Sequence, residues 1–246
     1  MFSKYLSKPF YWWLQTPLYA MRHVKNWLDI KEQVQRNGRS ANNEDQIIAA
    51  LLNQKTGYCA EVGALDGING SNSLFFERCG WKCLLVEAEP EQAAACARNR
   101  PYSITINAAA VAPHEEGRVT FQVIMHNKAM SSLSFDEEGE KHFGKHGVEF
   151  APTPIQIEAK TLDSMLEAAN FPIIDFITID VEGHELGVLQ GFDFERWKPL
   201  IIMLERIQTA PKPEISALME AHGYQKILTV PLGAIEDCND LYFKAR

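Results

Sequence analysis

Four carboxylates stand at the ends of apolar runs that have the character of buried strands. They are Glu61, Glu87, Asp180 and Glu205. Because the carboxyl ends of parallel strands meet at one edge of a sheet, we expect these side chains at one rim, where such sheets bind ligands. Helix N-termini also favour acidic residues, so each carboxylate has a purely structural explanation as well. Four of them at one rim favour a binding site.

A glycine-rich turn follows Glu61, with glycines at positions 63, 67 and 70 of the segment CAEVGALDGINGS. A strand, a tight glycine turn and a helix can cradle a nucleotide, because glycine lets the backbone approach a ligand closely. The pattern is not GxGxxG, since Leu65 stands two residues after Gly63. Asp66 would repel a dinucleotide pyrophosphate, whereas Glu61 and Asp66 would attract the ammonium and sulfonium of S-adenosylmethionine (SAM). The alternative is an acidic turn that binds nothing.

The second strand-end carboxylate has the spacing of a ribose ligand. Glu87 lies 20 residues after Gly67, where a carboxylate can hydrogen-bond the hydroxyls of a nucleoside. That spacing suits NAD and SAM alike, so it indicates a nucleoside without indicating the chemistry. We place the cofactor site on Glu61, Gly63, Ala64, Asp66, Gly67, Ser71, Glu87, Asn107 and Ala108.

Two carboxylates at the end of the most apolar strand are our catalytic candidates. Asp180 ends that strand, and Glu182 follows in the turn before the next helix. Such a pair can hold an acceptor hydroxyl and take its proton, and burial would raise the basicity of one carboxylate. The alternative is that both only cap the helix. The next candidates for the base are His126, His142 and His146; a divalent metal stays open, but we predict no metal ligands.

The composition is that of a soluble globular protein. The chain has 246 residues, 46% of them hydrophobic and 23% charged, which is enough for one large α/β domain. A net charge of −8 argues against nucleic acid as the main partner, because phosphate binding needs a basic footprint. Five cysteines without a CxxC spacing indicate reduced thiols in a cytoplasmic protein and no zinc site.

Residues 1–36 differ from the remainder, since they are rich in aromatic residues and carry a net charge of +4. Three roles are open for them: packing on the domain or on a second copy as a homodimer, peripheral contact with a membrane surface, or covering the substrate. No apolar run reaches the roughly 18 residues of a membrane span, and no secretory signal is present. We expect a cytoplasmic protein, with membrane association left open.

Residues 37–246 alternate strands with helices. Strands are predicted at 57–61, 82–87, 103–109, 119–124, 155–160, 173–180, 200–205, 224–230 and 240–244. Helices are predicted from 42 or 43 to 52 and at 73–78, 90–98, 161–169, 181–191 and 214–222. This alternation predicts a mostly parallel sheet with helices on both faces. Residues 126–154 have weaker periodicity, which indicates an insertion or lid on the substrate side, or a solvated excursion.

Five segments, in this order and spacing, resemble the FkbM family of SAM-dependent methyltransferases: EVGALDGINGS, LLVEAEPE, TLDSML, FITIDVEGHELGVLQGF and LIIMLE. The resemblance covers roughly residues 40–246. It implies a seven-stranded, Rossmann-like class I methyltransferase fold, SAM as the cofactor, and O-methylation of a hydroxyl on a sugar, glycolipid or natural product. Glu87-Ala88-Glu89-Pro90 replaces the simpler Glu-Pro step of many members, and we assign the ribose to Glu87. His184 stands where small residues are common and receives no family role.

Two other classes of function compete with a methyltransferase. An NAD-dependent sugar oxidoreductase should show GxGxxG and a Tyr/Lys or Cys/His catalytic set, and the sequence shows neither. A non-catalytic nucleoside-binding module would have no use for Asp180 and Glu182 at the rim, and it would bind SAM without turnover.

Overall fold

The computed structural model describes residue 40 and residues 43–125, 127–133, 151–206, 212–231 and 238–244. Residues 1–36 lie outside these ranges, as do most of the predicted insertion and the three histidines proposed as alternative bases. Their predicted roles stay predictions. Within the described ranges, every helix is too short or too polar to cross a membrane.

The main sheet has seven strands in the order β3-β2-β1-β7-β8-β10-β9. The strands are β1 (Tyr58–Val62), β2 (Lys82–Glu87), β3 (Ile104–Asn107), β7 (Phe176–Ile179), β8 (Ile201–Arg206), β9 (Tyr224–Pro231) and β10 (Cys238–Lys244). Only β10 runs against its neighbours β8 and β9. The predicted Rossmann-like, mostly parallel sheet is therefore confirmed, including the terminal β pair.

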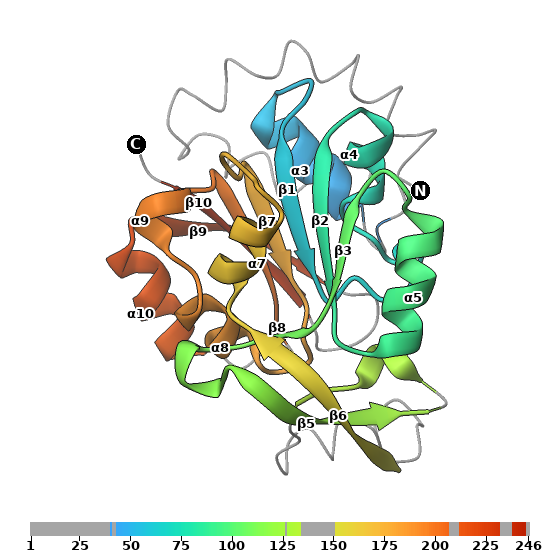
Figure 1. Cartoon of the computed structure of the whole chain (residues 1–246). Coiled ribbons are helices and arrows are strands. Elements are labelled where there is room, and N and C mark those ends of the chain that lie inside the picture. Colours follow the sequence, from blue (N-terminus) through green and yellow to red (C-terminus); the bar gives the residue numbers. More distant parts are fainter. Residues whose placement is uncertain are drawn as a thin grey trace.

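Helices cover both faces of this sheet (Figure 1). One face packs on α3 (Glu44–Leu52), α4 (Leu74–Arg78) and α5 (Pro90–Asn99). The other face packs on α7 (Leu162–Ala168), α8 (Glu185–Gln190), α9 (Phe194–Trp197) and α10 (Pro213–Ala221). The central strands are apolar on both sides because both faces are buried.

Strand alternation explains why the strand-end carboxylates share one face. Successive side chains of a strand point to opposite faces, so every second residue lies on the same side. Cys59 of β1, Phe176 of β7 and Met203 of β8 belong to the core on the α3 side. Two residues further along each strand, the same face carries Glu61, Thr178 and Glu205, and Asp180 follows Thr178. Glu87 follows Leu85 of β2 in the same way.

A smaller sheet of three strands lies beyond the carboxyl ends of the main strands (Figure 1). It contains β4 (Ala109–Ala110), β6 (Pro152–Lys160) and β5 (Gly117–Ile124), in that order. β5 and β6 are antiparallel, and Ile124 pairs with Pro152. The last three residues of the predicted insertion at 126–154 therefore belong to β6, which is longer than the predicted strand at 155–160. Two short 3-10 helices, η3 (Pro113–Glu115) and η4 (Lys128–Met130), flank β5.

One predicted strand is divided between the two sheets. The run 103–109 was expected as a single strand, but β3 ends at Asn107 and the following alanines pair with β6. Asn107 Nδ2 donates to the carbonyl oxygens of Glu87 and Ala88, both at 2.9 Å. These bonds tie the chain to the end of β2 at the point where it leaves the main sheet.

Candidate active site

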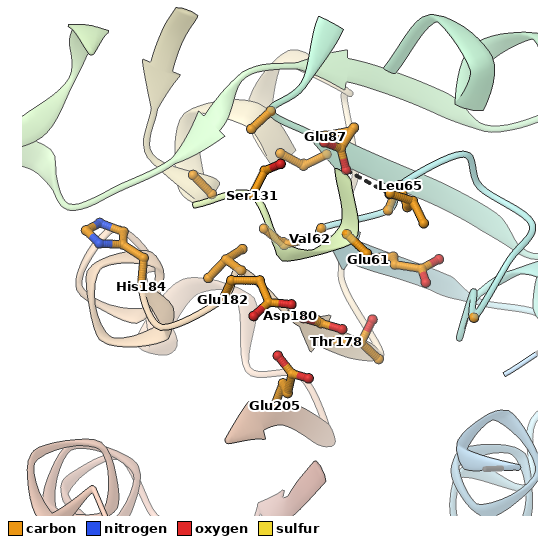
Figure 2. Close-up of a pocket in the computed structure, with 18 of the residues that line it drawn as sticks. Glu61, Val62, Leu65, Glu87, Ser131, Thr178, Asp180, Glu182, His184 and Glu205 are labelled. Atoms are coloured by element: carbon orange, nitrogen blue, oxygen red, sulfur yellow. Dashed lines mark hydrogen bonds between the residues drawn. The ribbon is translucent and has the colours of Figure 1, made fainter. Parts of the chain in front are cut away.

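A cavity of about 470 Å³ opens at the carboxyl ends of β1, β2, β7 and β8, and Figure 2 shows its walls. This volume is in the range of a small-molecule site. All four strand-end carboxylates line it, which confirms the expectation of a common rim. Both predicted catalytic residues and five of the predicted cofactor residues also line it: Asp180, Glu182, Glu61, Gly63, Ala64, Glu87 and Ala108.

Glu87 is held at one end of the cavity by two backbone donors. Its Oε2 accepts a hydrogen bond from the Leu65 amide at 2.7 Å, and its Oε1 accepts one from the Glu89 amide at 2.8 Å. The residue is 8% exposed, and this burial raises the pKa of its carboxyl to about 7 despite both donors. Glu89 instead caps α5 by accepting from the Gln92 amide at 2.7 Å. The choice of Glu87 over Glu89 as the ribose ligand therefore fits the geometry.

Glu61 anchors the glycine turn through a buried polar network. Its carboxylate accepts from the Ser71 hydroxyl at 2.8 Å, the Asn72 amide at 2.7 Å and the Ser73 hydroxyl. Arg100 is fully buried behind them and donates to both serine hydroxyls at 3.1 Å. Buried charges need such partners, because an unpaired one is costly. Glu61 therefore shapes the turn as well as the wall of the cavity.

The glycines of the turn make room for the protein itself. A Cβ on Gly63 would lie 1.7 Å from the carbonyl oxygen of Asp180, where β1 and β7 end side by side. A Cβ on Gly67 would lie 2.8 Å from both Arg100 Cγ and Cys96 Sγ. The sequence predicts that these glycines let the backbone approach the cofactor closely. In the structure Gly67 does not line the cavity, and its missing side chain admits the arginine and α5.

The other predicted cofactor residues outside the cavity wall are Asp66, Ser71 and Asn107. Asp66 was expected to attract the cations of SAM, but its carboxylate accepts from two backbone amides of its own turn at 2.8 and 2.9 Å. Ser71 is bonded to Glu61, and Asn107 to the end of β2. All three therefore hold the loops that form the site. Their direct contact with a cofactor is a prediction that this geometry does not favour.

The predicted catalytic pair has a third member. Asp180, Glu182 and Glu205 offer carboxylate oxygens that all lie within 4.8 Å of one another (Figure 2). Asp180 is exposed to the cavity, but protein surrounds its carboxyl on the other sides. This partial desolvation, together with the charges of Glu185 and Glu61, raises the pKa of the Asp180 carboxyl to about 6. Burial and the charges of Asp180 and Glu182 raise the pKa of Glu205 well above its ordinary value.

The turn that carries Glu182 is strained and well anchored. Glu182 has a φ of 55°, in the left-handed region that non-glycine residues seldom adopt. The Ser132 hydroxyl donates to its carbonyl oxygen at 2.9 Å. Buried Glu185 accepts from the Gly183 amide at 2.9 Å and from Lys212 Nζ at 2.8 Å, which closes the turn. Backbone strain held in this way is typical of functional sites.

The model of one protein family matches most of this chain. The family described as the methyltransferase FkbM domain matches residues 61–226, which contain the glycine turn and the carboxylate cluster. The chain belongs to the FkbM methyltransferase family. It is therefore a SAM-dependent methyltransferase by family, and the competing NAD-dependent oxidoreductase has no support.

Two of the solved structures similar to this FkbM-family chain are described as a methyltransferase and a methylase. A precorrin-6y C5,15-methyltransferase from Geobacter metallireducens has 12% identity and a TM-score of 0.44, over 81% of this chain and 87% of that one. A ribosomal protein L11 methylase from Lactobacillus delbrueckii has 12% identity and a TM-score of 0.45, over 84% and 79% of the two chains. The likeness is distant, so the assignment rests on the family match. The sequence matches no curated protein.

Several residues of the FkbM-family site were not predicted as site residues. Glu205 had the strand-end signal and was left out of the catalytic pair. Thr178 lies two residues before Asp180 on the same face, so strand alternation could have found it. Asn239 lines the cavity from β10 and donates to Glu44 Oε1 at 3.2 Å. Nothing in the sequence signals that contact, because it joins residues 195 positions apart.

SAM fits the half of the cavity between Glu61 and Glu87. Asn72 Oδ1 is buried there without a hydrogen-bond partner in the described structure, and Asn72 lines the cavity. An unpartnered acceptor next to the Glu61 carboxylate suits a ligand ammonium. Glu87 keeps lone pairs for ribose hydroxyls, and Gly63 and Ala64 present backbone between the two carboxylates.

The raised pKa of Glu87 predicts that SAM affinity depends on pH. Hydroxyl donors favour the ionised carboxylate, so lowering the pH through about 7 should weaken binding, by about tenfold per pH unit below it. In the free protein the sign is opposite: protonation removes the cost of the buried charge, and stability falls as pH rises through about 7. Calorimetric titration at pH 6 and pH 8 measures the binding effect. In Glu87→Gln the part of the pH dependence of SAM affinity that is due to Glu87 should disappear. An unchanged pH dependence in this variant would contradict the role of Glu87 as a ribose ligand.

Proposed function

We propose that this FkbM-family protein transfers the methyl group of SAM to a hydroxyl oxygen of a polar acceptor, such as a sugar, a glycolipid or a hydroxylated natural product. The observation that carries the proposal is the cluster of Asp180, Glu182 and Glu205 beside the proposed cofactor half of the cavity. A hydroxyl must lose its proton during methyl transfer, and a carboxylate of raised pKa is suited to accept it.

The remaining walls suit an acceptor with polar and apolar surface. Phe121 and Leu133 supply an apolar side from the small sheet and the segment after it. Lys128 and His184 also line the cavity, and Nε2 of the His184 ring lies 3.2 Å from Glu115 Oε2. In this proposal the small sheet supplies the acceptor side of the site, together with Lys128 and Leu133 from the described part of residues 126–154.

In this proposal each group of residues has one task. SAM supplies a methyl group on a positively charged sulfur. Glu61 and Asn72 would bind its ammonium, and Glu87 its ribose. Asp180 and Glu182 would hold the acceptor hydroxyl and accept its proton. Positioning of this kind can supply effective molarities of about 10⁵–10⁸ M, so much of the acceleration would come from orientation.

Ligand-dependent stability tests the cofactor, and a methyl-transfer screen tests the reaction. SAM and its demethylated product at about 100 times their Kd should each raise the free energy of unfolding by about 2.7 kcal/mol. NAD should give no thermal shift, because a pyrophosphate would meet Glu61 and Glu87. A screen of hydroxylated glycans and glycolipids with labelled SAM then measures turnover. Equal stabilisation by NAD, or none by SAM, would contradict the proposal, and SAM binding without turnover on any acceptor would favour a binding module.

A further inference from the structure

The cavity carries more carboxylates than the proposed cofactor binding and proton transfer need. Among the described residues, six carboxylate side chains line the cavity: Glu44, Glu61, Glu87, Asp180, Glu182 and Glu205. Lys128 is the one lysine or arginine in that lining, and its ammonium is paired with Glu89 and with Glu91, neither of which lines the cavity. Glu61 and Glu87 have tasks at the proposed cofactor half. The cluster of Asp180, Glu182 and Glu205 remains, and accepting one proton requires only one of its three carboxylates.

The spacing within this cluster matches the coordination shell of one ion. Its ligand oxygens all lie within 4.8 Å of one another. Oxygens on opposite sides of one Mg²⁺ are about 4.2 Å apart, and on opposite sides of one Ca²⁺ about 5 Å apart. Separations within this limit are of the size that one calcium, magnesium or manganese ion requires, with a contraction of less than about 1 Å where an oxygen pair is at the limit.

Two buried oxygens without partners lie at the same place. Thr178 is 2% exposed and lines the cavity, and its hydroxyl has no hydrogen-bond partner among the described residues. Glu205 Oε2 is also buried, and no donor group of the described residues reaches it; the Glu205 carboxyl can bond only the neighbouring Asp180 carboxyl, and only when one of the two is protonated. Figure 2 shows Thr178 beside Asp180, on the side of the cavity where Glu205 lies. Buried polar atoms are seldom left unsatisfied, so these two point to a ligand at this place. The carboxylate oxygen accepts only, and the hydroxyl oxygen can also accept, so both can face a cation.

We propose that Asp180, Glu182 and Glu205 bind a divalent cation, and that Thr178 supplies a further oxygen to the cation or to a water on it. All of these donors are oxygens, and none is a sulfur or an imidazole nitrogen. Such a set is typical of Mg²⁺, Mn²⁺ or Ca²⁺ rather than of zinc.

A cation at this position would take part in the proposed methyl transfer. That role rests on the proposed function, whereas the cation site itself does not. An acceptor hydroxyl bound to a divalent cation loses its proton more easily, because the positive charge stabilises the oxyanion. The cation would also hold the acceptor oxygen in place next to the transferred methyl group. The cluster carboxylates would then act on the hydroxyl through the cation as well as directly.

The test measures cation binding without SAM or acceptor. Full-length protein is treated with EDTA, dialysed and titrated with Mn²⁺, with calorimetry and electron paramagnetic resonance as readouts. We expect saturable binding of one equivalent. Glu205→Gln should weaken it at least tenfold, because it removes one charged ligand, and Thr178→Val should weaken it by a smaller factor. Absence of saturable binding to the unmodified protein would overturn the proposal.

Glu87→Gln is the matched control, because it removes a carboxylate from the other half of the same cavity. It should weaken SAM binding and leave Mn²⁺ affinity within about twofold of the unmodified protein. Glu205→Gln should weaken Mn²⁺ binding and leave SAM affinity nearly unchanged. Thermal melts in EDTA verify that each variant folds, and Asp180→Asn replaces Glu205→Gln if the latter does not. Equal Mn²⁺ affinity in the cluster variant and the unmodified protein would also overturn the cation site. Methyl transfer that persists in EDTA without Mn²⁺ binding would overturn the site and leave the proposed function standing.

Discussion

Replacing Asp180 with Asn is expected to reduce methyl transfer by about 10²-fold or more while SAM binding stays close to that of the unmodified protein. The substitution keeps the shape of the side chain and removes the group that would accept the proton. The fold should tolerate it, because removing a charge beside Glu182 and Glu205 relieves repulsion within the cluster. Single-turnover rates with saturating SAM separate the chemical step from binding.

A matched control lies at the other end of the same strand. Asp175 precedes β7, and its Oδ2 accepts from the Tyr58 amide at 2.8 Å, away from the cavity. Asp175→Asn should therefore leave turnover nearly unchanged. Glu182→Gln should resemble Asp180→Asn, because the two carboxylates belong to one cluster. Full turnover in both cluster variants would place the base elsewhere, with His126, His142 and His146 as the next candidates.

Gly63→Ala is expected to be among the most destabilising single substitutions in the chain. The added Cβ would lie 1.7 Å from a backbone oxygen of Asp180, so β1 and β7 would have to separate at the floor of the cavity. A clash with backbone cannot be relieved by turning a side chain. We expect a loss of about 4 kcal/mol or more in the free energy of unfolding, measured with urea, and loss of SAM binding.

Gly80→Ala separates the clash from backbone strain. Gly80 has a φ of +89° against +86° for Gly63, and a Cβ there would meet nothing within 4 Å. It should therefore cost only about 1–2 kcal/mol, the strain of a left-handed alanine. The difference between the two variants measures the contact of β1 with β7. Equal losses of unfolding free energy in the two variants would mean that the ends of β1 and β7 separate without cost, and that the argument for Gly63 is wrong.

The positions of the strand-end carboxylates were readable from the sequence. Apolar runs of four to eight residues predict buried strands, and a carboxylate after such a run predicts a residue at the ligand-binding edge. Alternation then assigns Glu61, Glu87 and Glu205 to one face, because each follows a core residue by two positions. These signals are local, so a single sequence contains them. They suffice for the fold class and for placing the strand-end carboxylates and Glu182 at one cavity, whereas four of the nine predicted cofactor residues lie outside its wall.

Other features depend on contacts between distant segments, and only the tertiary structure decided them. β5 and β6 read as ordinary strands, and their local sequence does not say that they pair with each other outside the main sheet. Gly67 faces Arg100, 33 residues away, and not a ligand. The side chains of Asp66 and Ser71 bond within their own turn, whereas Thr178 and Asn72 each have an oxygen at the cavity without a partner among the described residues. Whether a polar side chain is satisfied by the protein or left for a ligand is settled by packing, which brings donors and acceptors together across the whole chain.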